Sequence, residues 1–561
     1  MDPVAVTVLK VEPVAVSGRR RPEVRMSVPT VTELLLARAG DERPGLRFED
    51  RTWSWAEHVR TSARWAGGLR ETLDPGEPPH VGVLADNVPA FSFLLGACAF
   101  AGAVLVGLNP TRRGAALARD VRLADCRLVL TERKYRPLLA GLDLGGTAVR
   151  DLESWAPADD PAEPVPAAPD DLLMLIFTSG TSGDPKAVRC THGKIAFPGA
   201  MLAERFRLSS SDTAYVTMPM FHSNAVMAGW AVGLAAGATI ALRRRFSASG
   251  FLPDVRKFGA TYACYVGKPL SYVVATPPRP DDADNPLRLV YGNEGAAADL
   301  VAFGNRFGCE VVDAFGSTEG GVGFARTGDT PPGSLGRPAG DVAILHPDTG
   351  RPCPPAEFDA AGRLVNAAEA VGELVNTTGA GWFAGYYRDA RADAERLRDG
   401  RYHTGDLAYA DADGFCYFAG RLGDWLRVDG ENLGTAPIER ILLRHPAITD
   451  AAVYAVPDPV TGDQVMAAIV TDGTPLDPAG FGRFLAGQPD LGPKQVPRYV
   501  RTVRELPRTS TFKVLKRQLS AEGVACAGVL WEREGREIAY TPAAAQQGPM
   551  EEAWSFGSWP T

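Results

Sequence analysis

The sequence lacks the paired cysteines and clustered metal ligands that stabilise many small or secreted domains. Its eight cysteines are scattered, none forms a C-x-x-C pair, and none clusters with the seven histidines at a metal-ligand spacing. This pattern argues against structural zinc and favours a reducing compartment. We therefore expect a cytoplasmic protein.

An excess of positive charge is also missing. The chain has 59 Lys+Arg against 67 Asp+Glu and a formal net charge of −8, which argues against a general nucleic-acid-binding protein. Its 561 residues are 45% apolar and 22% charged, the composition of a soluble globular protein with room for more than one domain. No nucleic-acid partner is expected.

Long uninterrupted apolar segments are scarce as well. Residues 1–18 are valine-rich, but charged residues interrupt them, so they lack the apolar stretch of a signal peptide. Two uncharged stretches, Phe91–Leu108 and Ala225–Leu242, approach the length of a membrane span. Both contain glycines and end in strand-like runs. A buried helix that turns at Gly102 or Gly237 into a buried parallel strand explains them better.

Residues from about 27 to 155 alternate helical and strand patterns. Trp55–Leu73 reads as a helix, and His80–Leu84 reads as a strand that precedes a helix opening at Pro89. Such alternation predicts an α/β layer structure. Near the other end, Ala451–Val456 and Val465–Val470 read as paired strands of a smaller α/β region.

The most informative stretch begins with an apolar run, Leu172–Phe177, which reads as a buried strand. The strand leads into the hydroxyl- and glycine-rich loop Thr178-Ser179-Gly180-Thr181-Ser182-Gly183, which closes at Lys186. Glycines let backbone N–H groups face inward, hydroxyls add donors and the lysine adds positive charge, which together suit phosphates. The glycine spacing is not that of a Walker A loop, and a flexible surface hairpin is the alternative.

The string Phe177–Lys186 resembles the phosphate loop of the adenylate-forming (ANL) superfamily, which includes acyl-CoA synthetases, luciferases and the adenylation domains of peptide synthetases. Two segments, Arg243–Ser249 and Thr261–Gly267, resemble its fatty acid transport protein and very-long-chain acyl-CoA synthetase branch and actinobacterial FadD-type fatty acyl-CoA ligases. Taken as a charge run alone, Arg243–Arg245 reads as a solvated edge.

This resemblance implies a set of nucleotide contacts and a metal ligand. The implied nucleotide contacts, besides the loop residues above, are Gly292, Asn293, Glu294, Asp313, Phe315 and Gly316. Thr318 is expected to donate to phosphate and Glu319 to hold Mg²⁺, with Thr178 as a second candidate ligand. A hard cation on ATP takes a carboxylate and otherwise keeps its waters.

The later motifs imply further roles. Asp406 is assigned to the ribose hydroxyls, and Arg421 to ribose or phosphate. Lys513 aligns with the adenylation lysine of the superfamily, although Phe512 replaces the usual glycine before it. Lys516 is the rival for the same role.

The acyl group is expected near His222, at the mouth of its pocket. Behind it, the small-residue run Ala225–Ala236 could form the walls of an alkyl tunnel, and ordinary helix core is the alternative. His403 is interpreted as structural.

The expected fold is α/β, with a large multi-layer N-terminal domain of mixed sheets and helices and a small mobile α/β C-terminal domain. The expected divisions are a disordered arm at 1–26, a large adenylation domain at 27–420, a small domain at 421–540 and a flexible tail at 541–561. The resemblance places the hinge at Gly423, where glycine absorbs backbone rotation at low cost. The resemblance also implies that a swing of the small domain takes Lys513 out of the site and brings the loop at Gly430 into it.

The implied activity is that of an ATP-dependent fatty acid–CoA ligase with ATP, Mg²⁺ and coenzyme A. Two alternatives stay open: an adenylating ligase that loads a carrier-protein thiol, and a non-catalytic lipid-binding or transport protein. Joint retention of Lys186, Glu319, Asp406, Arg421 and Lys513 argues against the second. Peripheral contact with the inner face of the membrane for substrate uptake, and assembly as a homodimer, also stay open.

Overall fold

The computed structural model describes residues 28–155, 158–179, 185–360, 364–422, 426–428, 431–458, 462–509, 512–526, 529–533 and 538–542. The chain divides into two compact units. Unit 1 comprises Met1–Val342 and Asn376–Thr404, and unit 2 comprises Ala343–Val375 and Gly405–Thr561. The predicted boundary at residue 421 separates a domain that moves during the reaction, whereas these units are defined by compactness alone. The boundary therefore stays a prediction.

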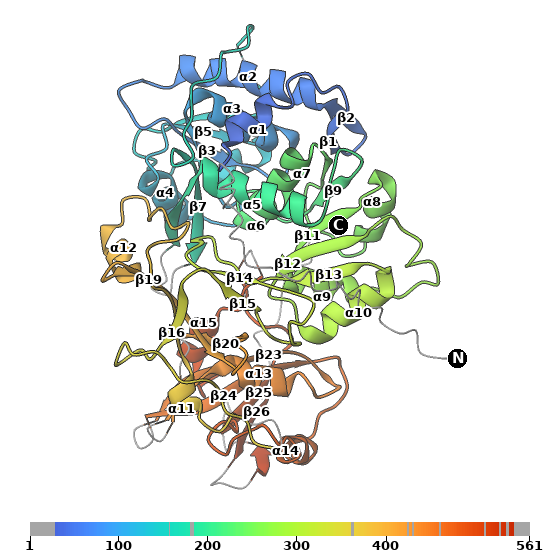
Figure 1. Ribbon diagram of the computed structural model, residues 1–561, viewed down its shortest axis with the longest axis vertical. Helices are drawn as coiled ribbons and strands as arrows, with labels where there is room; N and C mark the ends of the chain where they lie inside the picture. Colours follow the sequence, from blue (N-terminus) through green and yellow to red (C-terminus); the bar gives the residue numbers. More distant parts are fainter. Residues whose placement is uncertain are drawn as a thin grey trace, which may run out of the picture. The chain divides into compact units, whose positions relative to one another are not determined.

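Unit 1 contains a six-stranded sheet of order β6-β5-β3-β4-β7-β8, of which Figure 1 labels β3, β5 and β7. Its strands are β3 (His80–Leu84), β4 (Val104–Gly107), β5 (Leu128–Thr131), β6 (Ala148–Asp151), β7 (Leu172–Ser179) and β8 (Pro185–Thr191). All pairs are parallel except the β7–β8 hairpin. The helical segments between these strands are α3 (Pro89–Ala101), α4 (Gly114–Leu123) and η1 (Arg133–Leu138), and α2 (Trp55–Thr72) precedes them.

A second sheet of unit 1 has seven strands in the order β13-β12-β11-β9-β10-β1-β2. Its strands are β1 (Pro44–Phe48), β2 (Arg51–Ser54), β9 (Thr213–Val216), β10 (Thr239–Leu242), β11 (Tyr262–Val266), β12 (Leu289–Asn293) and β13 (Glu310–Asp313). The accompanying helices are α1 (Val31–Leu36), α5 (His192–Arg205), α6 (Ser223–Ala225), the π-helix η2 (Val226–Trp230), α7 (Ala231–Ala236), α8 (Phe251–Phe258), α9 (Gly267–Val274) and α10 (Ala297–Phe307). Within this sheet only β2 pairs antiparallel. The structure therefore confirms the α/β fold that the alternating sequence pattern predicted.

The two uncharged stretches form buried helix–turn–strand units, as expected. Helix α3 ends at Gly102, whose φ of 67° precedes the fully buried strand β4. Helix α7 likewise ends at Gly237, with a φ of 66°, before the buried strand β10. Glycine takes this left-handed backbone without a Cβ penalty. Among the described helices, none has the length and apolar character needed to cross a bilayer.

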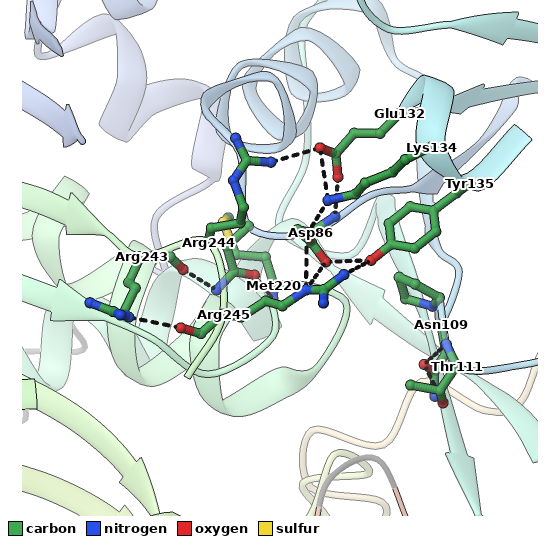
Figure 2. A network of polar contacts seen from close by, with 12 residues as sticks. Asp86, Asn109, Thr111, Glu132, Lys134, Tyr135, Met220, Arg243, Arg244 and Arg245 are labelled. Atoms are coloured by element: carbon green, nitrogen blue, oxygen red, sulfur yellow. Dashed lines mark hydrogen bonds and ion pairs between the residues drawn. The ribbon is translucent and has the colours of Figure 1, made fainter. Parts of the chain in front are cut away.

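The arginines Arg243–Arg245 follow β10 and join the two sheets (Figure 2). Each guanidinium forms an ion pair with a carboxylate of another segment, and the partners are Asp254, Glu132 and Asp86 in that order. Asp86 follows β3 and Glu132 follows β5, so the contacts reach from the seven-stranded sheet to the six-stranded one. The side chains of Arg244 and Arg245 are 40% and 64% exposed, so the run is solvated as expected, but distant carboxylates also fix its charges.

The remainder of unit 1 includes a small antiparallel hairpin of β14 (Gly323–Ala325) and β15 (Arg337–Ala339). A further sheet of order β16-β17-β19-β18, with β20 against β19, contains the residues at which the chain passes between units. Its strands are β16 (Val342–Leu345), β17 (Gly372–Asn376), β18 (Leu397–Arg398), β19 (Arg401–Ala410) and β20 (Cys416–Arg421). The short helices α11 (Ala367–Ala370) and α12 (Ala390–Arg396) lie between these strands in the chain.

Unit 2 has its own sheet of order β22-β21-β24-β25-β26-β27, with β23 against β24. Its strands are β21 (Leu426–Val428), β22 (Glu431–Leu433), β23 (Ile448–Asp458), β24 (Gly462–Thr471), β25 (Tyr499–Thr502), β26 (Val529–Arg533) and β27 (Tyr540–Pro542). Its helices are α13 (Thr435–Leu442), α14 (Pro478–Ala486) and α15 (Lys516–Glu522). The antiparallel pairing of β23 with β24 confirms the strand pair expected from the sequence.

The end of the described chain differs from the expected loose tail. Tyr540 is only 5% exposed, and its hydroxyl donates to the carbonyl of Pro497 at 2.6 Å. Ring burial and pairing with β26 hold β27 in place, including two residues assigned to the tail. The remaining tail from 543, the arm at 1–26 and the hinge residue Gly423 lie outside the described residues.

Candidate functional site

The β7–β8 hairpin carries the start and the end of the phosphate-loop motif. Thr178 on β7 faces Lys186 on β8 in the strand register, and Ser179 closes β7. The other predicted loop residues, Gly180, Thr181, Ser182 and Gly183, lie outside the described residues. The hairpin thus places a hydroxyl residue and a lysine opposite each other at the end where the loop connects its strands.

Glu319 lies next to this hairpin. Its Oε1 is 3.5 Å from the Thr178 hydroxyl and accepts a hydrogen bond of 3.0 Å from the hydroxyl of Tyr386. One residue earlier, the Thr318 hydroxyl is 2.9 Å from that of Ser223, the first residue of α6. His222 is the N-cap residue of the same helix. The structure therefore brings together the predicted positions 178, 186, 222, 318 and 319.

The predicted adenine contacts lie where β12 and β13 end. Gly292 pairs with Asp313 across these strands, and Asp313 accepts hydrogen bonds from the Gly295 N–H at 2.9 Å and the Tyr265 hydroxyl at 2.7 Å. Burial raises the pKa of Asp313 to about 6. An added Cβ on Gly292 would lie 2.2 Å from the Tyr265 carbonyl oxygen, so strand packing also demands glycine here.

The other members of this group flank those strands. Glu294 follows β12 with a positive φ of 65°. The ring of Phe315 packs edge-on against Phe324 with 5.4 Å between centroids, and Gly316 follows it. Within the described residues, the buried Oδ1 of Asn293 has no hydrogen-bond partner. A buried acceptor of this kind fits a donor on a bound base, because leaving it unsatisfied is costly.

The donor set near Glu319 fits magnesium that arrives on ATP. The described residues contain no group of three or more His, Cys, Asp or Glu side chains arranged to hold a metal. Mg²⁺ in nucleotide sites needs only one or two carboxylates, because phosphate oxygens and waters complete its octahedron. Glu319 and the Thr178 hydroxyl supply oxygen ligands of the required kind.

Two ionisable groups lie buried beside these residues. Cys190 on β8 is fully buried, and burial raises the pKa of its thiol to about 11. Lys194 on α5 is 3% exposed, and its ammonium donates to the carbonyl of Arg189 at 3.3 Å. Burial lowers the pKa of Lys194, while the charge of Glu319 opposes that shift.

Unit 2 holds the remaining predicted residues. Asp406 on β19 pairs with Arg421 on β20, and Oδ1 lies 3.5 Å from Nε. Lys513 lies in a turn in which its backbone N–H donates to the Thr509 hydroxyl at 3.1 Å. Phe512 has a positive φ of 66°, which is costly for a residue with a Cβ and explains why glycine is usual in this position of the superfamily. Gly430 lies outside the described residues.

The rival lysine, Lys516, is engaged in an ion pair. Its ammonium lies 2.7 Å from Oε1 of Glu439 and donates to the Thr435 hydroxyl at 2.8 Å. These partners on α13 hold the Lys516 ammonium within unit 2.

An apolar cavity in unit 1 lies away from the expected tunnel wall. The enclosed part has room for about one water molecule, and its lining includes Phe246, Ala263, Tyr265, Val273 and Phe303. Ala263 and Tyr265 line it from one side of β11, and Cys264, whose side chain lies on the other side of the strand, also borders it.

The run Ala225–Ala236 packs on that other side. An added Cβ on Gly229 would lie 2.9 Å from Val216 and 3.0 Å from Cys264. No residue of the run lines this cavity. Ordinary helix core, the alternative interpretation, therefore describes the run.

Sequence reasoning missed Tyr386 and its neighbour Arg396. The Tyr386 ring lies 5.2 Å from the Lys186 ammonium, while Arg396 Nε donates to the Tyr386 hydroxyl at 3.3 Å. Lys186 also pairs with Glu395 at 3.3 Å. The aromatic run from Trp382 to Tyr387 was the available signal, but its contacts are with residues far away in the sequence.

These features define the class of protein. An AMP-binding enzyme profile matches residues 25–387, and the profile of the AMP-binding enzyme C-terminal domain matches residues 437–513. The chain belongs to the AMP-binding enzymes, which confirms the resemblance to the adenylate-forming superfamily drawn from its motifs.

Particular relatives narrow the class. The chain is 58% identical over 511 residues to the medium/long-chain-fatty-acid–CoA ligase FadD17 of Mycobacterium marinum, covering 90% of this chain and 98% of the relative. It is 47% identical over 521 residues to the steroid-22-oyl-CoA synthetase of Rhodococcus jostii, covering 91% and 94%. The solved structure of ATP-bound MatB from Rhodopseudomonas palustris has a TM-score of 0.76 at 23% identity, covering 87% of this chain and 98% of that one, and shows the same fold.

Asp313 should make the stability of the protein depend on pH. The folded protein favours the protonated form of Asp313, because its pKa is about 6 in place of the ordinary 3.8. This contribution to stability is fully present below pH 3.8 and is lost as the pH rises through about 6. Asp313→Asn removes this loss, so the stability of the variant relative to the wild type should rise by about 1–3 kcal/mol between pH 4 and pH 7.5. Urea unfolding at both pH values measures it.

Asp212→Asn is the control with the opposite sign. Burial alone would raise the pKa of Asp212, but hydrogen bonds from the Ser209 N–H, Thr261 and Arg288 outweigh it and lower that pKa. This variant should lose stability relative to the wild type as the pH rises. A difference for Asp313→Asn that does not change with pH would contradict the assignment.

Proposed function

We propose that the protein is an ATP-dependent fatty acid–CoA ligase for acyl chains of medium length or longer. The observation that carries this proposal is the 58% identity over 90% of the chain to a medium/long-chain-fatty-acid–CoA ligase. Cytoplasmic ATP and coenzyme A would supply the reaction. Uptake of an apolar acid from the inner face of the membrane would suit such a substrate.

The reaction has two balanced steps. In the first, an oxygen of the fatty acid carboxylate attacks the α-phosphorus of ATP, the α–β phosphoanhydride bond breaks, and pyrophosphate leaves. In the second, the thiol of coenzyme A attacks the acyl carbonyl, loses its proton, and AMP leaves with the electron pair of the broken acyl–phosphate bond. The substrate carboxylate is the nucleophile, so the protein mainly orients reactants and neutralises developing charge.

The unit 1 residues fit the first step. Lys186 offers an ammonium and Thr318 a hydroxyl to phosphate oxygens, and the Thr318 hydroxyl is held by Ser223. Mg²⁺ bound with ATP neutralises phosphate charge, and Glu319 with Thr178 would hold it. We infer that His222 borders the acyl carboxylate, because it directly precedes Ser223.

The apolar cavity supports an alkyl substrate. Its lining by Phe246, Ala263, Val273 and Phe303 offers carbon contacts on all sides and few hydrogen-bond partners. We infer that the far end of the acyl chain enters this cavity when the lining side chains move apart. A steroid carboxylate is a second candidate substrate, because of the 47% identity to a steroid-22-oyl-CoA synthetase.

A substrate panel tests the function. With ATP, Mg²⁺ and coenzyme A, dodecanoate should give equal amounts of pyrophosphate, AMP and thioester. Each buried CH₂ contributes about 0.8 kcal/mol, so kcat/KM should climb with chain length until the cavity is full. Acetate or benzoate ahead of dodecanoate would refute the fatty acid substrate, and a steroid carboxylate ahead would favour the second candidate. Thioester formation only on a carrier protein would refute the coenzyme A acceptor.

Lys513→Ala should separate the two half-reactions. An ammonium at the α-phosphate stabilises the adenylation transition state alone, so the variant should lose about 2–4 kcal/mol there, the scale for one preorganised donor. Given synthetic acyl-adenylate and coenzyme A, it should still form thioester. Lys516→Ala is the matched control and should lose stability, through Glu439, rather than one half-reaction. If Lys516→Ala loses adenylation alone and Lys513→Ala does not, Lys516 is the adenylation lysine.

Val273→Phe should shift the chain-length optimum downward. Val273 lines the cavity and is 3% exposed, so a phenyl ring there occupies space that we assign to the acyl end. The ratio of kcat/KM for hexadecanoate over octanoate should fall about tenfold or more, the scale of two or more CH₂ groups excluded. Val274→Phe, on the same helix but outside the lining, is the control. An unchanged ratio in Val273→Phe would place the acyl chain elsewhere.

A further inference from the structure

Tyr386 lies beside the edge strand of the six-stranded sheet, next to the candidate site. Strand β8 is the outer strand of the six-stranded sheet, and segment 385–387 pairs along it. The Arg189 N–H donates to the Gly385 carbonyl at 3.0 Å, and the Tyr387 N–H donates to the Ala187 carbonyl at 2.8 Å. These bonds fix the backbone of Tyr386 beside the strand that also carries Lys186.

The direction of each hydrogen bond at the Tyr386 hydroxyl follows from its partners. Arg396 Nε can only donate, so the hydroxyl oxygen accepts from it at 3.3 Å. The single hydroxyl hydrogen then remains for Oε1 of Glu319, at 3.0 Å. A cationic donor polarises the hydroxyl and strengthens the bond it gives to the carboxylate.

This chain of bonds constrains the Glu319 carboxylate. Both the Tyr386 hydroxyl and the more distant Thr178 hydroxyl approach Oε1, which leaves Oε2 with no hydrogen-bond donor recorded among the described residues. A glutamate side chain loses substantial rotamer freedom when it is fixed, and a carboxylate already held need not lose it again on binding.

We propose that Tyr386 is a positioning residue that holds Glu319 by Oε1 so that Oε2 is presented to the divalent cation that accompanies ATP. This inference rests on the proposed function and adds a residue to its site. Lys186 adds to the same arrangement, because its ammonium lies 5.2 Å from the Tyr386 ring and 3.3 Å from Glu395. The ring thus also limits where the lysine charge can lie.

A purely structural role is the competing account. Tyr386 is 3% exposed and packs edge-on against Phe383 at 5.1 Å between centroids. If space filling were its whole role, Tyr386→Phe would keep the ring, the packing and the contact with Lys186, and would change nothing that depends on the cation. Tyr386→Phe therefore separates the hydroxyl from the ring.

Tyr387→Phe is the matched control. Neighbouring side chains of an extended segment point to opposite sides, and the Tyr387 hydroxyl donates to Asp125 at 2.9 Å instead of to Glu319. This variant removes the same atom, from the next residue, and again from a bond to a carboxylate. Its effect on stability calibrates the loss of one such hydrogen bond.

The experiment measures binding of α,β-methylene-ATP to the full chain by calorimetry, in excess Mg²⁺ and in EDTA. Tyr386→Phe should weaken binding in Mg²⁺ about tenfold, the scale for a hydrogen bond to a charged group, and should leave binding in EDTA within about twofold, because the cation is then absent. The Mg²⁺ concentration that half-saturates pyrophosphate release should rise similarly. Tyr387→Phe should change neither.

A double-mutant cycle tests whether the loss in Tyr386→Phe acts through Glu319. In a Glu319→Gln background, Tyr386→Phe should add no further Mg²⁺-dependent loss, because the carboxylate it positions is gone. Equal weakening with and without Mg²⁺, or full additivity with Glu319→Gln, would overturn the proposal. If the wild-type protein binds the analogue but has no ligase activity, the proposed function is refuted. The binding measurements then still decide whether Tyr386 positions Glu319.

Discussion

The side chain of Asn87 joins the two sheets from which the candidate site is built. Its Nδ2 donates to the carbonyls of Met218 at 2.9 Å and Arg243 at 3.1 Å, and its Oδ1 accepts from the Met220 N–H at 2.8 Å. Asn87 is only 3% exposed, so these bonds form where water does not compete. They fix the segment before His222 against the end of β3. The geometry of the candidate site in unit 1 thus depends on the Asn87 amide, which is not itself one of the candidate site residues.

Much of the fold could be predicted because its signals are local. A continuous apolar run followed by glycine and a second apolar run specifies a buried helix, a left-handed turn and a buried strand, and Gly102 and Gly237 have that geometry. The motif residues Thr178, Glu319 and Thr318 could also be identified, because each stands in a short string with a recognisable order. The contact between Thr178 and Glu319 could not be predicted in this way, because Thr178 ends β7 of the six-stranded sheet and Glu319 follows β13 of the seven-stranded sheet.

What could not be predicted depends on contacts between distant segments. Arg243–Arg245 looks like a solvated charge run in the sequence, since nothing in it indicates that its carboxylate partners follow β3 and β5 or lie on α8. Tyr386 belongs to no short motif identified in the sequence. Only the pairing of its segment with β8 shows that it lies beside Glu319. The small-residue run before Gly237 suits a tunnel wall or a tight core equally well. Only the packing of Gly229 on Val216 and Cys264 decides between them.

The burial of Cys190 has a consequence for the lifetime of the intermediate. An acyl-adenylate is an acylating agent that any thiolate can attack, whether it belongs to coenzyme A or to the enzyme. With a pKa of about 11, the Cys190 thiol is ionised in only about one molecule in ten thousand at neutral pH, and its burial keeps it from the solvent. This thiol therefore does not compete with coenzyme A for the acyl group of the intermediate.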